Sequence, residues 1–351
     1  MTVHIFSRSK WDEPHRLRQQ LAGLLSSGYQ VEYWSPKSSG NLNRLNLPNE
    51  LRLRQFRFIE RFASVPFVSI ANAIFLYFYL KANVKKGDVV FNFLPELIWI
   101  PRQRCSAIIS VLNDDFASMA PKVSAWWVRW MLKRMAAKAD AALYVSTLLR
   151  TKYPAKNGYL FYPWSDFEFF SEKNKKRRDV ILYWGYISSH LNLEQIEEMA
   201  RQILDSSLSL EIHLVGPLDS LVSERILELA QKFSCVKYFP PRSLKALDME
   251  RVLCGLELLG KDFKNAGAVE FPNKAPRLLA YGIPLVFSGC ALLKEPYFIE
   301  YQENISALVS EINEKSDAID ASISDYFLKN NSKIRLDKIR EILKKVSLSS
   351  N

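Results

Sequence analysis

The sequence predicts an α/β fold made of two doubly wound domains in series. Short apolar segments alternate with helical segments in the first half of the chain, and the same alternation starts again in the second half. The length of 351 residues also suits two domains. The predicted domains are 1–165 and 166–330, and 331–351 form a C-terminal helix and tail.

The first half opens with a short apolar strand at 3–6. The acidic pair before Pro14 marks the start of a helix, whose leucines recur at helical spacing until Gly28. A very apolar stretch, 66–80, is short and is interrupted by Asn72, so we expect a core helix there. The other predicted strands are 31–34, 89–93, 107–111 and 141–145.

The second half repeats the pattern after a charged run at 171–179. The tail at 332–346 mixes apolar residues with many Lys and Arg, which predicts an amphipathic helix. Strands are predicted at 180–184, 210–215, 236–239, 255–259 and 284–287, and helices at 193–204, 222–233 and 275–281.

Positive charge is concentrated in the first half. Residues 1–165 hold 23 Lys and Arg against 10 Asp and Glu, whereas 166–351 hold 25 against 27. Seven of the eight Trp also lie in the first half. A basic, Trp-rich half predicts an anionic partner: a membrane surface, a phosphorylated lipid or a nucleic acid.

Cysteine and histidine give no indication of a metal site. The four cysteines form no C-x-x-C, and the four histidines form no H-E-x-x-H. Scattered cysteines fit a reducing cytosol, and the N-terminus lacks a charged leader followed by an apolar run. We expect a cytoplasmic protein that needs neither metal nor cofactor.

Two α/β domains in series place a cleft between them, and ligands bind where parallel strands end. The loop after the first strand carries Asp12, Glu13, His15 and Arg16. Asp12, Glu13 and His15 are candidate bases, and Arg16 is a candidate acceptor contact. The alternative is ordinary capping of the next helix by the acidic residues.

Asp114 and Asp115 follow the strand at 107–111. Paired acids at the end of a strand can position sugar hydroxyls or act as a base, so Asp115 is a candidate base and Asp114 a candidate acceptor contact. The alternative for this pair is an N-cap for the next helix.

Strand ends of the second half carry small residues. Gly185-Tyr186 follows one strand and Gly216-Pro217 follows another, which would let a phosphate approach the backbone. Neither G-x-G-x-x-G nor G-x-x-x-x-G-K-[ST] is present, which argues against a dinucleotide or P-loop enzyme.

A basic pair marks the start of the helix predicted at 275–281. Lys274 and Arg277 are three residues apart, so they share one face of its first turn. Together with the positive end of the helix, they suit a diphosphate.

One helical stretch mixes aromatic and basic residues. This pattern is typical of a helix lying in a membrane interface, and the alternative is a core helix with a solvated basic face. The residues concerned are Trp126, Trp127, Arg129, Trp130, Lys133 and Arg134.

Taken in order, these pieces resemble the GT-B glycosyltransferases, specifically the bacterial group 1 / family 4-like enzymes of cell-surface polysaccharide assembly. The resemblance covers nearly the whole chain. Its motifs are Trp11-Asp12-Glu13-Pro14 with Arg16, Asn113-Asp114-Asp115-Phe116, Tyr162-Pro163-Trp164-Ser165-Asp166, Tyr183-Trp184-Gly185-Tyr186-Ile187, Leu214-Val215-Gly216-Pro217, and Pro272-Asn273-Lys274 through Gly282-Ile283-Pro284.

The resemblance implies two Rossmann-like domains that face a cleft. The second would bind a nucleotide-sugar donor, and the first would bind a lipid-linked acceptor of O-antigen, capsule or lipopolysaccharide type, at the cytoplasmic face of the membrane. Metal is not obligatory in this family, and transfer with inversion or retention stays open.

By position in those motifs, the donor contacts would be Gly185, Tyr186, Gly216, Pro217, Arg242, Asn273, Lys274 and Arg277. The family commonly has Glu where this chain has Arg277. This departure keeps open a non-catalytic binding or scaffold protein of the same pathway. A nucleic-acid-binding protein rests on charge alone, because no recognised nucleic-acid module is present.

Overall fold

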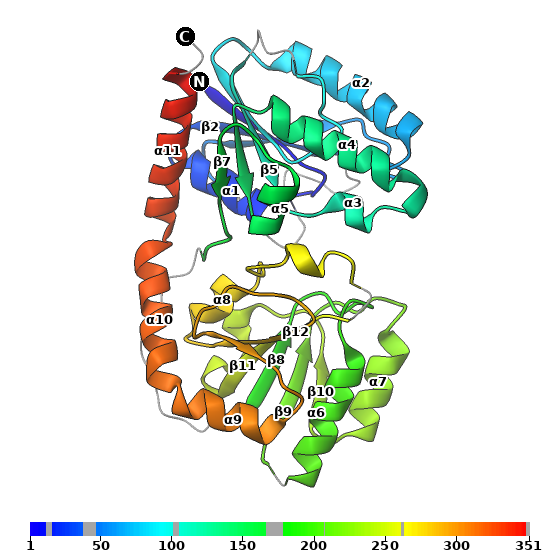
Figure 1. Ribbon diagram of the computed structural model, residues 1–351, viewed down its shortest axis with the longest axis vertical. Helices are drawn as coiled ribbons and strands as arrows, with labels where there is room; N and C mark the ends of the chain where they lie inside the picture. The colour runs from blue at the N-terminus through cyan, green and yellow to red at the C-terminus, as the bar shows by residue number, and fades with distance from the viewer. Residues whose placement is uncertain are drawn as a thin grey trace. The chain divides into compact units, whose positions relative to one another are not determined.

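The chain folds into two compact units, each built on one parallel sheet (Figure 1). The first unit comprises Met1–Pro163 with Ser332–Asn351, and the second comprises Trp164–Asn331. The predicted pair of doubly wound α/β domains is confirmed. The structure is a computed structural model, and it describes residues 1–11, 16–37, 47–100, 105–165, 178–206, 208–260 and 263–348.

The first sheet has seven parallel strands in the order β3-β2-β1-β4-β5-β6-β7. The chain builds outward from β1 in one direction and then crosses to β4, so the switch in strand order lies between β1 and β4. The strands are β1 (Thr2–Phe6), β2 (Gln30–Pro36), β3 (Leu51–Phe56), β4 (Asp88–Asn92), β5 (Cys105–Leu112), β6 (Ala141–Tyr144) and β7 (Gly158–Leu160).

Helices cover both faces of the first sheet: α1 and α11 lie on one side, and α2 and α4 lie on the other (Figure 1). Helix α11 packs on α1 and β5 and buries Ile339, Ile342 and Val346, so the C-terminal helix belongs to the first unit. The helices are α1 (Leu17–Ser26), α2 (Pro66–Asn83), α3 (Phe116–Met119), α4 (Lys122–Lys138), α5 (Thr147–Lys152) and α11 (Ser332–Leu348).

The second sheet has six parallel strands in the order β10-β9-β8-β11-β12-β13, with its switch between β8 and β11. The strands are β8 (Val180–Trp184), β9 (Glu211–Val215), β10 (Val236–Phe239), β11 (Val252–Leu258), β12 (Leu285–Ser288) and β13 (Phe298–Glu300). The helices are α6 (Leu193–Asp205), α7 (Ser223–Lys232), α8 (Ala275–Leu279), α9 (Ile305–Glu314) and α10 (Ser316–Lys329).

Three strands were not predicted, and all three lie at the edge of a sheet. These are β3 and β7 in the first sheet and β13 in the second. An edge strand pairs on one side only and buries less surface, so it does not need the continuous apolar run that marks a central strand. Strand β3 has the sequence LRLRQF, and β7 and β13 have three residues each.

The expectation that 66–80 is a core helix is wrong. Helix α2 buries Leu76 and Leu80, but Phe67 is 85% exposed and Phe78 is 61% exposed. Ile74 on the same helix is exposed as well. The helix is apolar all round, while only one side of it packs on the sheet. Within the described residues, no helix has the length and apolar character needed to span a bilayer.

Candidate active site

Two glycines shape the carboxyl end of the second sheet. Gly185 follows β8 with φ +148°, and Gly216 follows β9 with φ +155°. A Cβ atom on Gly216 would lie 1.7 Å from the carbonyl oxygen of Gly185, so the two turns touch backbone to backbone. The Gly185 N–H donates to Val215 and the Gly216 N–H donates to Phe239, so both groups already serve the strands. Gly185, where an added Cβ would meet nothing within 4 Å, therefore offers room for a ligand, whereas Gly216 is buried and makes the close backbone contact.

Aromatic side chains surround this glycine pair. Tyr186 is 54% exposed, and its hydroxyl lies 3.3 Å from Asp219 Oδ2. The indole N–H of Trp184 donates to the carbonyl of Arg242 at 2.8 Å. Pro217 lies in the turn after Gly216, and its carbonyl accepts from Ile187 N–H at 2.9 Å. Flat rings beside bare backbone suit the stacking of a planar base.

The two predicted cations lie over consecutive rings of β8. Lys274 Nζ is 4.1 Å from the ring centroid of Tyr183, and the Arg277 guanidinium is 5.8 Å from that of Trp184. Lys274 also pairs with Glu257 Oε2 at 2.8 Å. Burial lowers the pKa of Lys274, but Glu257 and Tyr183 outweigh it, and the pKa is raised overall.

Lys274 thus has an acidic partner that the sequence argument did not consider. Helix α8 has only five residues, and the charge of Lys274 is matched by Glu257. Arg277 is half-buried over the ring of Trp184, and Asn273 is exposed in the turn before α8. Sequence reasoning missed Glu257, although an acidic residue in the apolar strand VLCGLEL was a signal.

The backbone and the side chain of Arg242 contact different parts of the second unit. Its carbonyl serves Trp184 at the strand ends, while its guanidinium lies 5.2 Å from the ring centroid of Phe239 and lines a cavity of about 140 Å³. That cavity lies against the face of the sheet, over Leu182 and His213. Burial lowers the pKa of His213 despite the neighbouring Glu211. The side chain of Arg242 thus faces the sheet rather than the glycine turns.

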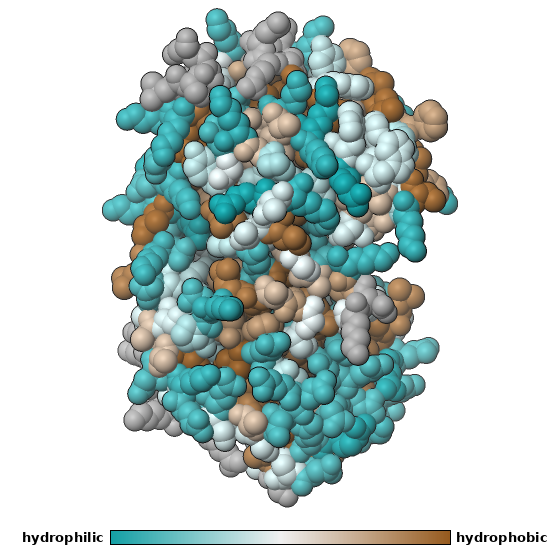
Figure 2. Space-filling view, in the orientation of Figure 1, coloured by the Kyte–Doolittle hydropathy of each residue, from teal (hydrophilic) through white to brown (hydrophobic). Residues whose placement is uncertain are grey.

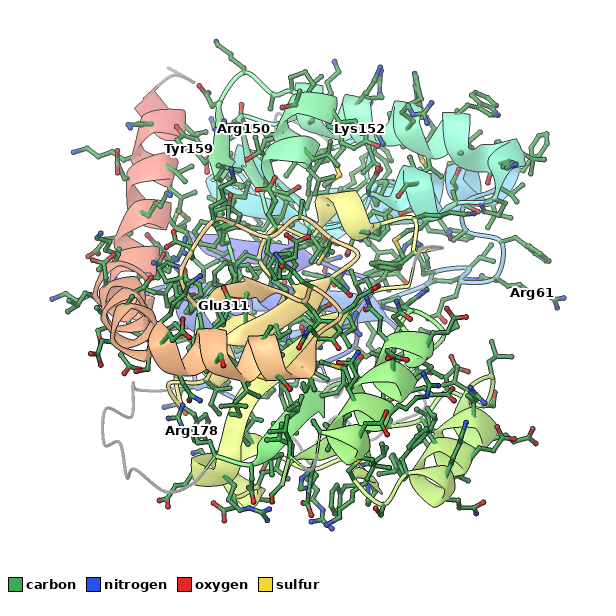
Figure 3. All side chains as sticks on the ribbon, turned by 60° about the horizontal axis from the view of Figure 1, so that its bottom comes forward. Arg61, Arg150, Lys152, Tyr159, Arg178 and Glu311 are labelled. Atoms are coloured by element: carbon green, nitrogen blue, oxygen red, sulfur yellow. The ribbon has the colours of Figure 1, made fainter. Side chains whose placement is uncertain are left out.

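Asp115, the predicted base, is enclosed in the first unit. It accepts from Lys152 Nζ at 2.5 Å and from the Tyr153 hydroxyl at 2.7 Å, and it is 3% exposed. Burial alone would raise the pKa of this carboxyl, but Lys152 and Tyr153 bring it below its usual value. Figure 3 labels Lys152 on α5. These contacts fit an anchor for α5 better than a group that takes a proton from substrate.

Asp114 is the more accessible of the pair. Its Oδ2 accepts from Nη2 of the Arg18 guanidinium at 3.4 Å, and it also accepts from the side-chain amide of Asn113. Arg16 is exposed and precedes α1, where its N–H donates to Gln19 Oε1 at 3.1 Å. The candidate bases Asp12, Glu13 and His15 lie outside the described residues.

A second pair at the end of the first sheet was not predicted. Arg8 follows β1, Glu96 follows β4, and Arg8 donates to Glu96. Glu96 is fully buried, and burial raises the pKa of its carboxyl. The Arg8 guanidinium lies 5.3 Å from the ring centroid of Phe58 and 5.9 Å from that of Phe116. The sequence signal was one acidic residue within the apolar loop FNFLPELIWI.

The predicted interface helix forms α4 and presents tryptophans on the surface. Trp126 is 60% exposed and Trp130 is 41% exposed. Trp127 stacks on Trp130 at 4.7 Å, and its indole N–H donates to Ser69 of α2. Arg134 lies 5.5 Å from the ring centroid of Trp130. Arg129 and Lys133 are exposed on the same helix.

Helices α2 and α4 together form one surface, here called the α2/α4 face. Neither helix contains an acidic residue. Figure 2 shows apolar residues gathered along the part of the first unit where α2 lies. Arg61, which extends from the surface in Figure 3, lies 4.9 Å from the ring centroid of exposed Phe62 just before α2. The α2/α4 face is thus apolar, aromatic and basic.

Comparison with known proteins supports the fold. No family model matches the sequence, and no curated protein matches it at a significant level. The chain is similar over 98% of its length to Anabaena Alr3699/HepE in complex with UDP, 100% of which is covered, with a TM-score of 0.72 and 11% identity.

Two further solved structures are similar over nearly their whole length. One is the lipopolysaccharide outer core galactosyltransferase WaaB, with a TM-score of 0.63, 12% identity, and coverage of 98% of this chain and 99% of that one. The other is TarM, with a TM-score of 0.71, 7% identity, and coverage of 97% and 98%. This chain therefore has the GT-B fold of these proteins, as the sequence resemblance implied.

Proposed function

We propose that this protein is a glycosyltransferase that moves one sugar from a nucleotide-sugar to an acceptor. The observation that carries the proposal is the contact between Gly185 and Gly216 beside the exposed ring of Tyr186. This contact leaves the open backbone of Gly185 and a stacking surface at the carboxyl end of a parallel sheet, where nucleotides bind. The similar HepE structure is a complex with UDP, which supports a uridine nucleotide.

In this proposal, the second unit binds the donor and lowers the free-energy barrier to departure of its nucleoside diphosphate. The acceptor hydroxyl attacks the anomeric carbon, and the bond from that carbon to the diphosphate oxygen breaks. Negative charge then grows on the leaving diphosphate, where a fixed cation stabilises it. Arg277 supplies that cation, and the Lys274–Glu257 pair holds Tyr183 and the start of α8 in place.

The proton of the acceptor hydroxyl must also be taken up: if the reaction inverts the anomeric centre, a base of the enzyme takes it, and if it retains configuration, the departing diphosphate oxygen can take it. The enclosed carboxylate of Asp115 does not suit that task. Asp114 at the end of β5 does, and so do Asp12, Glu13 and His15 of the loop after β1, by the sequence argument.

A thermal-shift screen tests the donor site, with UDP, GDP, CMP, dTDP and ADP, each with and without magnesium. We expect UDP to raise Tm most, because a ligand that binds only the folded state stabilises it. Arg277→Ala should cut that shift, while Lys294→Ala, an exposed cation of the same unit, should leave it unchanged. A protein that responds to no nucleotide would favour the scaffold alternative, which Arg277 in place of the usual Glu already suggests.

We further propose that the acceptor is lipid-linked and that the α2/α4 face binds the anionic cytoplasmic surface of the membrane. Exposed aromatic rings suit the interface between headgroups and acyl chains, and basic residues add attraction to anionic lipids. The first unit supports this proposal, with 29 Lys and Arg against 12 Asp and Glu.

Vesicle sedimentation tests the membrane proposal. Each basic residue near an anionic surface contributes about 1 kcal/mol, so Arg129→Gln with Lys133→Gln should weaken binding on the order of 30-fold. Phe67→Ser with Phe78→Ser should weaken binding even at high salt, because that contribution is not electrostatic. The control is Leu221→Ser with Leu227→Ser, two exposed apolar residues of the second unit. Equal binding by all three double variants would contradict the assignment of the face.

A further inference from the structure

Three neighbouring strands of the first sheet are followed by polar side chains that form two hydrogen-bonded groups. Arg8 follows β1, Glu96 follows β4 and Asn113 follows β5, and these strands are adjacent around the switch point. Asn113 donates to Asp114, Asp114 pairs with Arg18, and Arg18 donates to the hydroxyl of Ser9, next to Arg8. Ligands bind at such a crevice in open parallel sheets.

Each of these three side chains keeps a buried polar atom without a hydrogen-bond partner in the described part of the chain. The atoms are Arg8 Nε, Glu96 Oε2 and Asn113 Oδ1. A buried polar atom left unpaired costs about 1–3 kcal/mol, so native proteins usually supply a partner. Three such atoms at the ends of three adjacent strands indicate that a polar ligand completes the set.

The unpaired atoms define the chemistry of that ligand. Arg8 Nε can only donate, whereas Glu96 Oε2 and Asn113 Oδ1 of the neutral amide accept. A hydroxyl group both donates and accepts, so a polyol suits a site that presents donors and acceptors together. An anion would satisfy Arg8 alone and would face the carboxylates of Glu96 and Asp114. The charge of Arg8 is moreover already balanced by Glu96.

We propose that Arg8, Glu96 and Asn113 form a hydroxyl-binding subsite for the saccharide end of the acceptor. The proposal rests on the proposed function, because it names the chemistry of the acceptor site in the first unit. Arg8 has a side chain 39% exposed and contacts the sugar, while Glu96 at 0% is a positioning residue that fixes the guanidinium. The rings of Phe58 and Phe116 hold that guanidinium from the other sides.

Saturation-transfer NMR on the full chain tests the subsite, with methyl glycosides of glucose, galactose, mannose and N-acetylglucosamine as probes. We expect saturation transfer to at least one glycoside. Arg8→Ala and Glu96→Gln should weaken its affinity about fivefold or more, the loss of roughly one hydrogen bond. Arg8→Gln keeps an N–H donor at similar length, so it should recover part of the affinity and serves if Arg8→Ala does not fold.

The matched control is Arg54→Ala, because Arg54 also pairs with a carboxylate, Glu32, but lies within β3 rather than at the strand ends. Its glycoside affinity should equal that of the wild type. In all variants, the shift in Tm caused by UDP should stay unchanged, since the donor site is in the other unit. A purely structural role of Glu96 would lower Tm and leave glycoside affinity intact.

Three results would overturn the subsite: no saturation transfer to any glycoside, an affinity that Arg8→Ala leaves unchanged, or displacement of the glycoside by inorganic phosphate. If UDP shifts Tm in any of these cases, the proposed function stands without the subsite. Conversely, the glycoside could bind in a way that depends on Arg8 while no nucleotide stabilises the protein. That result would support the subsite and contradict the proposed nucleotide-sugar donor.

Discussion

The two sheets carry similar ion pairs at their switch points, but the pairs differ in how exposed they are. Each places a cation, a carboxylate and aromatic rings where the strand order reverses: Arg8 with Glu96 in the first sheet and Lys274 with Glu257 in the second. In the first pair the cation is 39% exposed and the carboxylate 0%, whereas in the second pair both are nearly covered, at 13% and 14%.

The two switch points therefore expose different chemical groups. In the first unit, side chains line the strand ends and leave polar atoms unpaired. In the second, Lys274 and Glu257 pair with each other, and the accessible surface is the backbone of Gly185 beside Tyr186. Side chains with mixed donors and acceptors suit hydroxyl groups, while bare backbone suits the close approach of a diphosphate or a base.

The two units also differ in net charge. The first unit has 29 basic residues against 12 acidic ones, and the second has 19 against 25. The exposed aromatic residues of α2 and α4 also belong to the basic unit. One unit is therefore suited to an anionic surface and the other is not.

The largest expected effect comes from Gly216→Ala. The new Cβ would overlap the carbonyl of Gly185 at 1.7 Å, and neither backbone can move without breaking a strand hydrogen bond. We expect the free energy of unfolding to fall by about 4 kcal/mol or more. Urea unfolding of this variant and of Gly185→Ala makes the comparison.

Gly185→Ala is the matched control, because it shares a positive φ but has nothing within 4 Å of the place where its new Cβ would lie. Backbone strain alone should cost it about 1–3 kcal/mol. Equal unfolding midpoints for the two variants would show that the backbone contact does not set the geometry of these turns.

The next effect concerns the pair that closes the second switch point. Lys274→Met leaves Glu257 without its cation in a covered site, so unfolding should become easier by about 3–5 kcal/mol. Replacing both residues, with Lys274→Met and Glu257→Leu, should recover most of that loss. Urea unfolding measures both variants.

Nucleotide binding then separates the two cations of the second unit. Because Glu257 balances Lys274, the double variant should keep its response to UDP, whereas Arg277→Ala should lose it. A double variant that folds but no longer responds to UDP would return Lys274 to the donor site.

The smallest effect lies in the first sheet, at a charge cluster away from its switch point. Glu32 pairs with His4 and Arg54, and these contacts lower its pKa from 4.5 to about 2. A carboxyl whose pKa is lowered by folding stabilises the protein at pH values above its pKa in the unfolded chain. That stability disappears as the pH falls through its pKa in the folded protein. Glu32→Gln should thus cost about 1–2 kcal/mol at pH 7 and less at pH 3. A cost that does not change with pH would contradict the assignment.

Sequence reasoning located the central strands of both sheets well, but it missed three of the four strands at the sheet edges. Strand β8 begins and ends where it was predicted, because buried parallel strands read as continuous apolar runs. Strand β10 was also placed correctly, although it lies at an edge of the second sheet. Strand β3 alternates apolar and charged residues beside a single neighbour, and it was missed. Helix α2 was misplaced in the core, since apolar composition does not reveal which faces find a partner.

Some residues of the candidate site could be found from the sequence, and others could not. Gly185 and Gly216 were predicted from the sequence because small residues after strands stand out along the chain. Asp115 stood out equally, yet its carboxylate serves Lys152 and Tyr153, which lie 37 and 38 residues further along. Glu96 was missed because its partner, Arg8, is 88 residues away.

The sequence by itself determined the α/β class, the two sheets, the strand centres and the concentration of positive charge in one half. These follow from local apolar patterns and from residue counts, which need no knowledge of distant contacts. Only the tertiary structure decided that Lys274 is neutralised by Glu257, that Asp115 is enclosed, and that α2 presents aromatic rings to solvent. Each of these depends on which side chain lies opposite, and folding brings such partners together from far apart in the chain.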